Sequence, residues 1–181
     1  NLIQSQYTGA VHLVNPKGGT IMGRAVSRSL AEVPDPVDLA VLIVPSKAMP
    51  SALADCGTRG IRAAIIMAGG FREIGAEGAA LEDEILRIAR DNQIRILGPN
   101  CIGLLDTHYP LDTTFLPPPL PARGDIGFLS HSGAFCAAVI DWSRQQGFSF
   151  SRLVSLGNQT DITETDLLAL MAADEHTRVL A

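Results

Sequence analysis

The sequence predicts an α/β fold built on parallel sheets and divided into two units. Apolar runs of strand length alternate with amphipathic helical patterns at intervals of roughly 20 to 30 residues, as expected for βαβ crossovers. The runs at 39–44 and 63–67 are apolar throughout, which is typical of strands covered on both faces. The segment 115–121 is rich in proline and favours stiff, extended chain, so it separates the two units.

Before the proline-rich segment, strands are expected at 11–14, 39–44, 63–67 and 94–97. A short helix or turn is expected at 26–33, and helices at 49–58 and 77–91. The helix at 77–91 has the clearest pattern, because Leu81, Ile85 and Ile88 repeat at helical spacing. The residues expected on its solvent side are Glu82, Asp83, Glu84 and Arg90.

After the proline-rich segment, we expect strands at 126–129 and 150–155, helices at 134–142 and 164–173, and the beginning of a strand at 178–181. Thr163 to Asp166 form a capping pattern for the last helix. These elements place a first domain at 1–115, a linker at 116–124 and a second domain at 125–181. Residues 1–6 are typical of the end of a helix, so both domains are expected to be partial and the chain to be a piece of a longer protein.

The composition argues against several classes of function. Hydrophobic residues make up 46% of the chain, yet no apolar run approaches the roughly 20 residues of a membrane span. The formal net charge is −5 and there is no basic stripe, which argues against nucleic acid as a partner. The cysteines Cys56, Cys101 and Cys136 are scattered and fit neither a disulfide framework nor a zinc site. We therefore expect a reduced, cytoplasmic protein with no membrane partner and no metal site.

The stretch at 125–142 predicts an anion site. Residues 126–129 suit a buried strand, residues 134–142 suit a helix, and between them stand Ser130, His131, Ser132 and Gly133. A strand that turns directly into a helix leaves free N–H groups at the helix start, where the helix dipole adds positive charge. Small residues there let a phosphate come close. A turn that binds nothing is the alternative.

A lysine follows the first predicted strand. Where a NAD-binding fold would place an acidic residue for the ribose hydroxyls, this chain has Asn15, Pro16 and Lys17. A cation at this place pairs with a phosphorylated ribose, so Lys17 favours coenzyme A, with its 3′-phosphate, or NADP. A solvated loop lysine is the alternative that this residue leaves open.

Two further strand ends carry small and polar residues, and ligands bind at the carboxyl ends of strands in open parallel sheets. The glycines in 67–70 let a ligand lie close to the backbone, although a simple turn is the alternative. In 98–101 a proline fixes the turn, and Asn100 offers both a hydrogen-bond donor and an acceptor. Cys101 either places a thiol at the strand end or packs as a small buried hydrophobe, as Cys56 and Cys136 are expected to do.

Six short motifs stand in register across both units. They are VNPK at 14–17, PxPVDLAV at 34–41, GFxE at 70–73, GPNCIG at 98–103, SxSGA at 130–134 and VSLGN at 154–158. With these motifs in this order, the chain resembles the nucleoside-diphosphate-forming acyl-CoA synthetases, which include the ADP-forming acetate–CoA ligases and relatives of the succinyl-CoA synthetase α subunit. The resemblance implies a Rossmann-like CoA-binding domain, truncated at its N-terminus, and then the start of a flavodoxin-like ligase domain near Asp125.

The resemblance also implies roles for single residues. It places Pro16, Lys17, Met67, Ala68 and Gly69 beside CoA, and Asn100 and Cys101 near the thiol end, where the acyl phosphate forms. Ser130, His131, Ser132, Gly133 and Ala134 would hold a phosphate that is carried by a phosphohistidine loop outside this chain. His131 stands where the family more often has Gln or Arg. It is expected to help bind phosphate when protonated, and its being the phosphorylated group is the alternative.

The activity implied is that of an acid–thiol ligase, which interconverts acyl-CoA, ADP and phosphate with a free acid, CoA and ATP. The implied partners are CoA, a small carboxylic acid, an ATP-grasp domain or β subunit, and further copies in an oligomer. ATP or ADP and Mg²⁺ would bind outside these residues, and the fragment alone is expected to be inactive. One alternative is the acyl-CoA-sensing region of a protein lysine acetyltransferase. Another is an NADP-binding redox module, which fits Lys17 but explains neither GPNC, SHSG nor the second domain.

Overall fold

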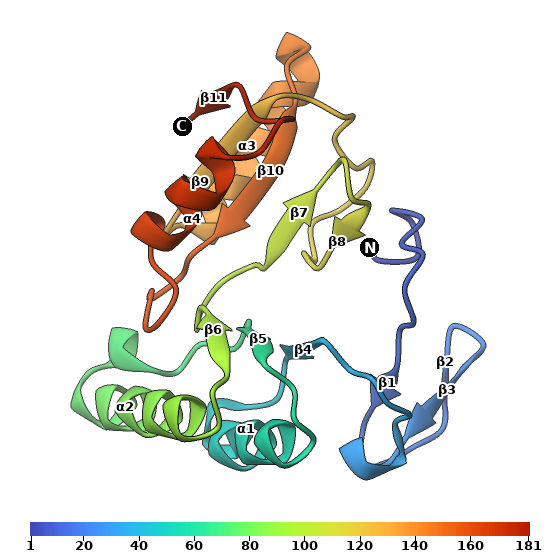
Figure 1. Ribbon diagram of the computed structural model, residues 1–181, viewed down its shortest axis with the longest axis vertical. Helices are drawn as coiled ribbons and strands as arrows, with labels where there is room; N and C mark the ends of the chain where they lie inside the picture. Colours follow the sequence, from blue (N-terminus) through green and yellow to red (C-terminus); the bar gives the residue numbers. More distant parts are fainter.

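The structure is a computed structural model that describes residues 1–181. It contains two α/β units and a small third sheet near the N-terminus (Figure 1). The predicted α/β class with parallel sheets is confirmed. No helix in the chain has both the length and the apolar character needed to cross a bilayer.

The first unit is a three-stranded parallel sheet of β4 (Leu39–Leu42), β5 (Ala63–Ile66) and β6 (Arg95–Leu97). The helices α1 (Met49–Thr58) and α2 (Ala76–Asp91) lie side by side on one face of it (Figure 1). Short 3-10 turns precede them at Ser46–Ala48 and Arg72–Ile74. Burying apolar side chains between the helices and the sheet is the main stabilising term for this unit.

The small sheet contains β1 (Leu13–Val14), β2 (Thr20–Ile21) and β3 (Arg24–Ser27) in the order β1-β3-β2. The short helix or turn predicted over 26–33 is therefore partly wrong. Val26 is buried and pairs with Leu13, so strand pairing outweighs local preference, and only a 3-10 turn at Leu30–Glu32 follows. The predicted helix end at 1–6 is also wrong, because these residues form turns.

The second unit is a five-stranded sheet in the order β11-β9-β10-β7-β8. Its strands are β7 (Leu104–Asp106), β8 (Leu111–Asp112), β9 (Ile126–Ser130), β10 (Phe150–Ser155) and β11 (Val179–Leu180). Helices α3 (Gly133–Gln146) and α4 (Glu164–Ala172) cover opposite faces. Phe128 packs in the cluster that contains α3 residues, whereas its neighbour Leu129 packs against the cluster that contains Met171 of α4.

No strand was expected over 104–112, yet β7 pairs antiparallel with β10, and β8 pairs with β7. These strands are too short to show a period of two in the sequence. Residues before the proline-rich segment thus belong to the second sheet by hydrogen bonding. The domain limits at 115 and 125 remain predictions.

The two units meet where the loop after β10 runs along β6. The N–H of Ile162 donates to the carbonyl of Ile96 over 3.1 Å, and the N–H of Thr160 donates to that of Gly98 over 3.2 Å. The Asp161 carboxylate accepts from the Ile96 N–H at 2.7 Å. Backbone hydrogen bonds therefore fix the second unit against the edge of the first sheet.

Glu82 strengthens this junction from the first unit. Its side chain is fully buried, so its predicted place on the solvent side of α2 is wrong. The carboxylate accepts from Arg72 Nε at 2.5 Å, from the Arg72 N–H at 3.1 Å, from Asn158 Nδ2 at 2.9 Å and from the Thr160 hydroxyl. Burial by itself would raise the pKa of Glu82, but the hydrogen bonds from Thr160, Arg72 and Asn158 outweigh burial, and its pKa is lowered.

Replacing Glu82 with glutamine should destabilise the protein, because a neutral amide presents N–H groups to donors that now face a carboxylate. We expect the free energy of unfolding to fall by roughly 2–3 kcal/mol, the scale of a hydrogen-bonded charge lost from a buried site. Urea unfolding followed by circular dichroism measures the change. Glu84→Gln, at an exposed position of the same helix, is the matched control and should be neutral.

The same variant gives a pH dependence. The folded pKa of Glu82 lies below its unfolded value, so its stabilisation is complete above the unfolded pKa of about 4.3 and is lost as the pH falls through the folded value. The stability difference between wild type and Glu82→Gln should therefore shrink below about pH 4. A difference that stays constant down to pH 2 would contradict the buried, ionised state.

Candidate functional site at the strand ends

The carboxyl ends of strands from both units converge at this junction (Figure 1). They are the turn 67–70 after β5, the loop 98–103 after β6, the turn 130–133 after β9 and the loop 156–163 after β10. The N–H of Asn158 donates to the carbonyl of Pro99 at 2.9 Å, and the N–H of Leu156 donates to that of Ser130 at 2.8 Å. Three of these loops are thus linked directly through backbone hydrogen bonds.

The turn after β5 places Gly69 beside Asn100. A Cβ atom on Gly69 would lie 3.2 Å from Asn100 Oδ1, so this approach favours a residue without a side chain. The Asn100 N–H donates to the carbonyl of Ala68 at 3.0 Å. Two of the predicted CoA-contacting segments, Met67–Gly69 and Asn100, are therefore brought together.

Glu73 closes the same turn. Its Oε1 accepts from the N–H groups of Gly70 at 2.5 Å and Phe71 at 3.1 Å, and its Oε2 accepts from Asn158 Nδ2 at 2.7 Å. Burial opposes ionisation, but the hydrogen bonds from Asn158 and the backbone lower the pKa of Glu73. Glu73 was noted only as part of the GFxE motif, and the structure adds it to the site.

Cys101 lies at the strand end, but its side chain turns into the core. It is 3% exposed, and its thiol donates to the carbonyl of Ile66 at 3.4 Å. Burial raises its pKa to about 11, so the thiol stays protonated at neutral pH. This arrangement matches the buried alternative for Cys101. Cys56 and Cys136 are buried in helix packing, as expected.

The turn between β9 and α3 has the geometry expected of a helix start. The Ser132 side chain caps α3 by accepting from the N–H of Phe135 at 3.2 Å, and Ser130 Oγ accepts from the N–H of Ser132 at 3.1 Å. Gly133 is packed against Ile102, where a Cβ atom would lie 2.6 Å from Cγ2. The α3 N-terminus therefore adjoins the loop that carries Asn100 and Cys101.

His131 is paired with α4 instead of standing alone. Its Nε2 lies 2.5 Å from Oε1 of Glu164, in the first turn of α4. Hydrogen bonds from Gln159, from its own N–H and from His131 lower the pKa of Glu164. The carboxylate holds the imidazole through Nε2, so Nδ1 is the ring nitrogen left for another partner. Neither Glu164 nor Gln159 was predicted as a site residue.

Pro16 and Lys17 lie apart from these loops, in the exposed turn after β1. The N–H of Lys17 donates to Asn15 Oδ1 at 3.0 Å, which fixes a tight turn and leaves the ammonium group in solvent. No hydrogen bond or ion pair joins Lys17 to the other predicted site residues. The small sheet carries this turn as a separate structural element.

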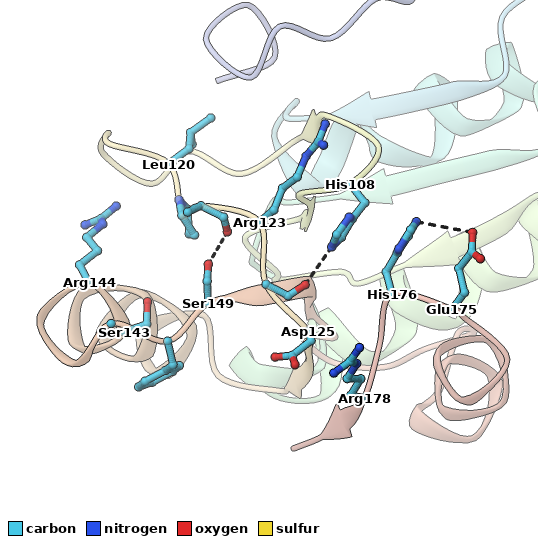
Figure 2. Close-up of a pocket in the computed structure, with 15 residues that line it drawn as sticks. His108, Leu120, Arg123, Asp125, Ser143, Arg144, Ser149, Glu175, His176 and Arg178 are labelled. Carbon is cyan, nitrogen blue, oxygen red and sulfur yellow. Dashed lines mark hydrogen bonds and ion pairs between the residues drawn. The ribbon is translucent and has the colours of Figure 1, made fainter.

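A hollow of about 930 Å³ lies at the other end of the second sheet. Figure 2 shows His108, Arg123 and His176 around it, near the amino ends of β9 and β10. The rings of His108 and His176 are stacked with their centroids 4.0 Å apart. No predicted site residue lines this hollow. The chain has no cluster of three or more His, Cys, Asp or Glu side chains suited to a metal ion.

Comparison with known proteins gives the family of this arrangement. Residues 1–107 match the model of the CoA binding domain. The chain belongs to the CoA binding domain family. Residues 123–181 match the model of the succinyl-CoA ligase like flavodoxin domain. The Rossmann-like CoA-binding unit and the flavodoxin-like unit expected from the sequence are confirmed by these matches.

Two named relatives match nearly the whole of this chain and are themselves longer proteins. An acetate–CoA ligase [ADP-forming] I of Archaeoglobus fulgidus is 40% identical over 96% of this chain and 25% of its own length. The α subunit of acetate–CoA ligase [ADP-forming] I from Pyrococcus furiosus is 40% identical over 99% of this chain and 40% of its own. This chain thus spans between a quarter and two fifths of the length of these two relatives.

A solved structure shares the fold across both units. It is the dinucleotide forming acetyl-coenzyme A synthetase 1 of Ca. Korarchaeum cryptofilum in complex with phosphate and ADP. The TM-score is 0.92 at 34% identity, and the likeness covers 99% of this chain and 38% of that chain. The relative placement of the two units therefore recurs in a protein whose complex holds phosphate.

Glu82 is the one missed residue for which the sequence holds a readable signal. The buried stripe of α2 is Gly78, Glu82, Ile85 and Ala89, which are spaced at four, three and four residues. Glu82 therefore stands at a core position of an amphipathic helix, where a carboxylate needs donors from another segment. Asn158 is the last residue of the VSLGN motif. Its partners Glu73 and Glu82 lie far away in the sequence, so no local pattern shows these contacts.

The close approach of the two units predicts a strong effect at Gly157. Both Gly157 and Gly147 have left-handed backbone, with φ of +59° and +74°, so alanine costs about 1 kcal/mol at either place. At Gly157 a Cβ atom would also collide with the carbonyl of Pro99, whereas at Gly147 it meets nothing within 4 Å. We expect Gly157→Ala to lower the unfolding midpoint in urea well beyond Gly147→Ala. Equal losses would contradict the tight junction.

Proposed function

We propose that the full-length protein is an ADP-forming acyl-CoA synthetase that acts on acetyl-CoA. The observation that carries this proposal is the junction itself, where the strand-end loops of a CoA-binding unit meet the N-terminus of α3 in a ligase-like unit. Ligands of open parallel sheets bind at this end. The names of the relatives described above support the same activity.

CoA is proposed to lie along the ends of the first unit's strands. The Met67–Gly69 turn and Asn100 offer close backbone approach and an amide. Pro16 holds the turn that carries Lys17, and Lys17 offers a cation for the 3′-phosphate. Cys101 fixes the loop after β6 against the core, because its thiol is buried and donates a hydrogen bond to the carbonyl of Ile66. These groups fit a ligand that is anionic at one end and amide-rich along its arm.

Phosphate is proposed to bind at residues 130–134. The α3 start combines free N–H groups, a helix dipole and a small residue at Gly133. Fixed N–H dipoles stabilise negative charge as it moves, without reorganising during the reaction. His131 would add a donor through Nδ1 when protonated, while Glu164 holds its other nitrogen.

In the proposed reaction, phosphate attacks acyl-CoA and releases CoA and an acyl phosphate. The phosphoryl group then passes to a histidine outside this chain and frees the carboxylic acid, and ADP accepts it to give ATP. Residues of this chain would orient the thioester and the phosphate against each other. The nucleotide, Mg²⁺ and an ATP-grasp domain or β subunit belong to the other part of the enzyme. A cytoplasmic location and an oligomer are part of the proposal.

The alternatives have less support. The relatives named above are ligases, which gives no support to the acyl-CoA-sensing region of a lysine acetyltransferase. An NADP-binding module would use Lys17 but leaves the α3 start and the second unit without a role. Adding the protein to a fixed amount of NADPH should therefore leave the nicotinamide fluorescence unchanged, and a saturable change would favour this alternative.

Lys17→Ala should weaken CoA more than dephospho-CoA, because only CoA carries the 3′-phosphate that the ammonium group pairs with. A charge-assisted contact of this kind predicts a loss of about tenfold in CoA affinity, measured by calorimetric titration. Lys17→Arg keeps the charge and is the matched control, with a smaller loss. Equal losses for both ligands would remove the role assigned to Lys17.

Turnover is tested with the full-length protein, magnesium and γ-labelled ATP. We expect acid-labile phosphate on the protein that disappears when CoA and acetate are added, because the phosphohistidine would then be discharged into acyl-CoA synthesis. Protein without any label that still binds CoA tightly would contradict the ligase and favour a CoA sensor.

A further inference from the structure

The side-chain amide of Asn158 has a partner for every polar atom. Its Nδ2 donates to Glu73 Oε2 at 2.7 Å and to Glu82 Oε2 at 2.9 Å, and its Oδ1 accepts from Asn100 Nδ2 at 3.3 Å. An amide nitrogen has two hydrogens, and both are used here. Asn158 therefore connects α2, the turn after β5 and the loop after β6.

This network admits only one orientation of the Asn158 amide. Both carboxylates are acceptors, and the pKa of each is lowered, so they face the nitrogen and would repel the oxygen. The oxygen is therefore directed to Asn100. Glu82 has a fully buried side chain and four donors, so it anchors the amide firmly.

The fixed oxygen of Asn158 in turn orients Asn100. Asn100 Nδ2 must point toward Asn158, so Asn100 Oδ1 points toward Gly69, 3.2 Å from where a Cβ atom would be. The Glu73 oxygen nearest Gly69 already accepts from Gly70 and Phe71. Asn100 Oδ1 accepts no hydrogen bond within the chain, and its residue is exposed.

We propose that Asn158 is a positioning residue that holds the Asn100 side-chain oxygen toward the Gly69 turn, so that the ligand there is recognised through a hydrogen-bond donor. The inference rests on the proposed function, under which the donor is an amide N–H or the thiol of the pantetheine arm of CoA. Asn100 touches the ligand, whereas Asn158 acts through Asn100. Without Asn158, the Asn100 amide is free to rotate and to present its nitrogen instead.

The test is a double-mutant cycle on CoA affinity, measured by calorimetric titration of the full-length protein. Asn100→Ala and Asn158→Ala should each weaken CoA by about tenfold, the scale of one hydrogen bond and its orientation. Because both changes remove the same contact, the double variant should bind no more weakly than Asn100→Ala. Additive losses, or full affinity in Asn158→Ala, would overturn the positioning role.

Thr160→Val is the matched control. It removes a donor from Glu82 within the same loop but leaves the contact between Asn158 and Asn100 in place. It should lower the unfolding midpoint while CoA affinity stays within about twofold of wild type. If Asn158→Ala does not fold, Asn158→Ser takes its place, because its short hydroxyl does not span the distance to Asn100. A loss of CoA affinity in Thr160→Val equal to that in Asn158→Ala would show a merely structural role and overturn the inference.

Desulfo-CoA, which keeps the amides and lacks the thiol, separates the two donors. An equal loss in Asn158→Ala for both ligands assigns the donor to an amide N–H, and a loss with CoA alone assigns it to the thiol. Failure of the wild-type protein to bind CoA is a different result. It removes the proposed function, and this inference with it.

Discussion

The buried carboxylate of Glu82 is the interaction on which the junction depends. A fully buried anion is tolerated only where donors replace its water, and here two of them, Asn158 and Thr160, come from the other unit. Removing the second unit would leave the carboxylate with Arg72 as its only partner, so burial of Glu82 favours one relative placement of the two units. The backbone hydrogen bonds from the loop after β10 to β6 involve residues next to this group, and they fix the orientation of the second unit against the first.

That loop serves both halves of the proposed chemistry. Asn158 faces the loops of the CoA-binding unit, while the next residue, Gln159, donates to Glu164, which holds His131 at the start of α3. A shift of the loop would therefore disturb the proposed CoA site around Asn100 and the proposed phosphate site at the start of α3 together. This linkage suits a reaction in which a phosphate must meet a thioester at a fixed distance.

The strength of the sequence patterns explains which parts of the fold could be predicted. Apart from β7 and β8, the strands and helices of both α/β units were predicted within a few residues, with the largest difference at the end of α3, because periodic segments carry strong local signals. The hairpin of β7 and β8 and the strand β3 were missed, because pairing partners outside the segment stabilise them. The predicted residues at 67–69 and at 100 lie together, whereas Lys17 lies in a separate turn, and their roles remain proposals.

The sequence by itself determined the α/β class, the order of the elements and the position of the loops at the strand ends, since these follow from periodicity and turn chemistry along the chain. Only the tertiary structure decided that Glu82 is buried and ionised, that Cys101 faces the core, and that Asn158 is hydrogen bonded to Asn100 and Glu82. The physical reason is that these states depend on donors and packing contributed by residues far away in the sequence, which no local pattern contains.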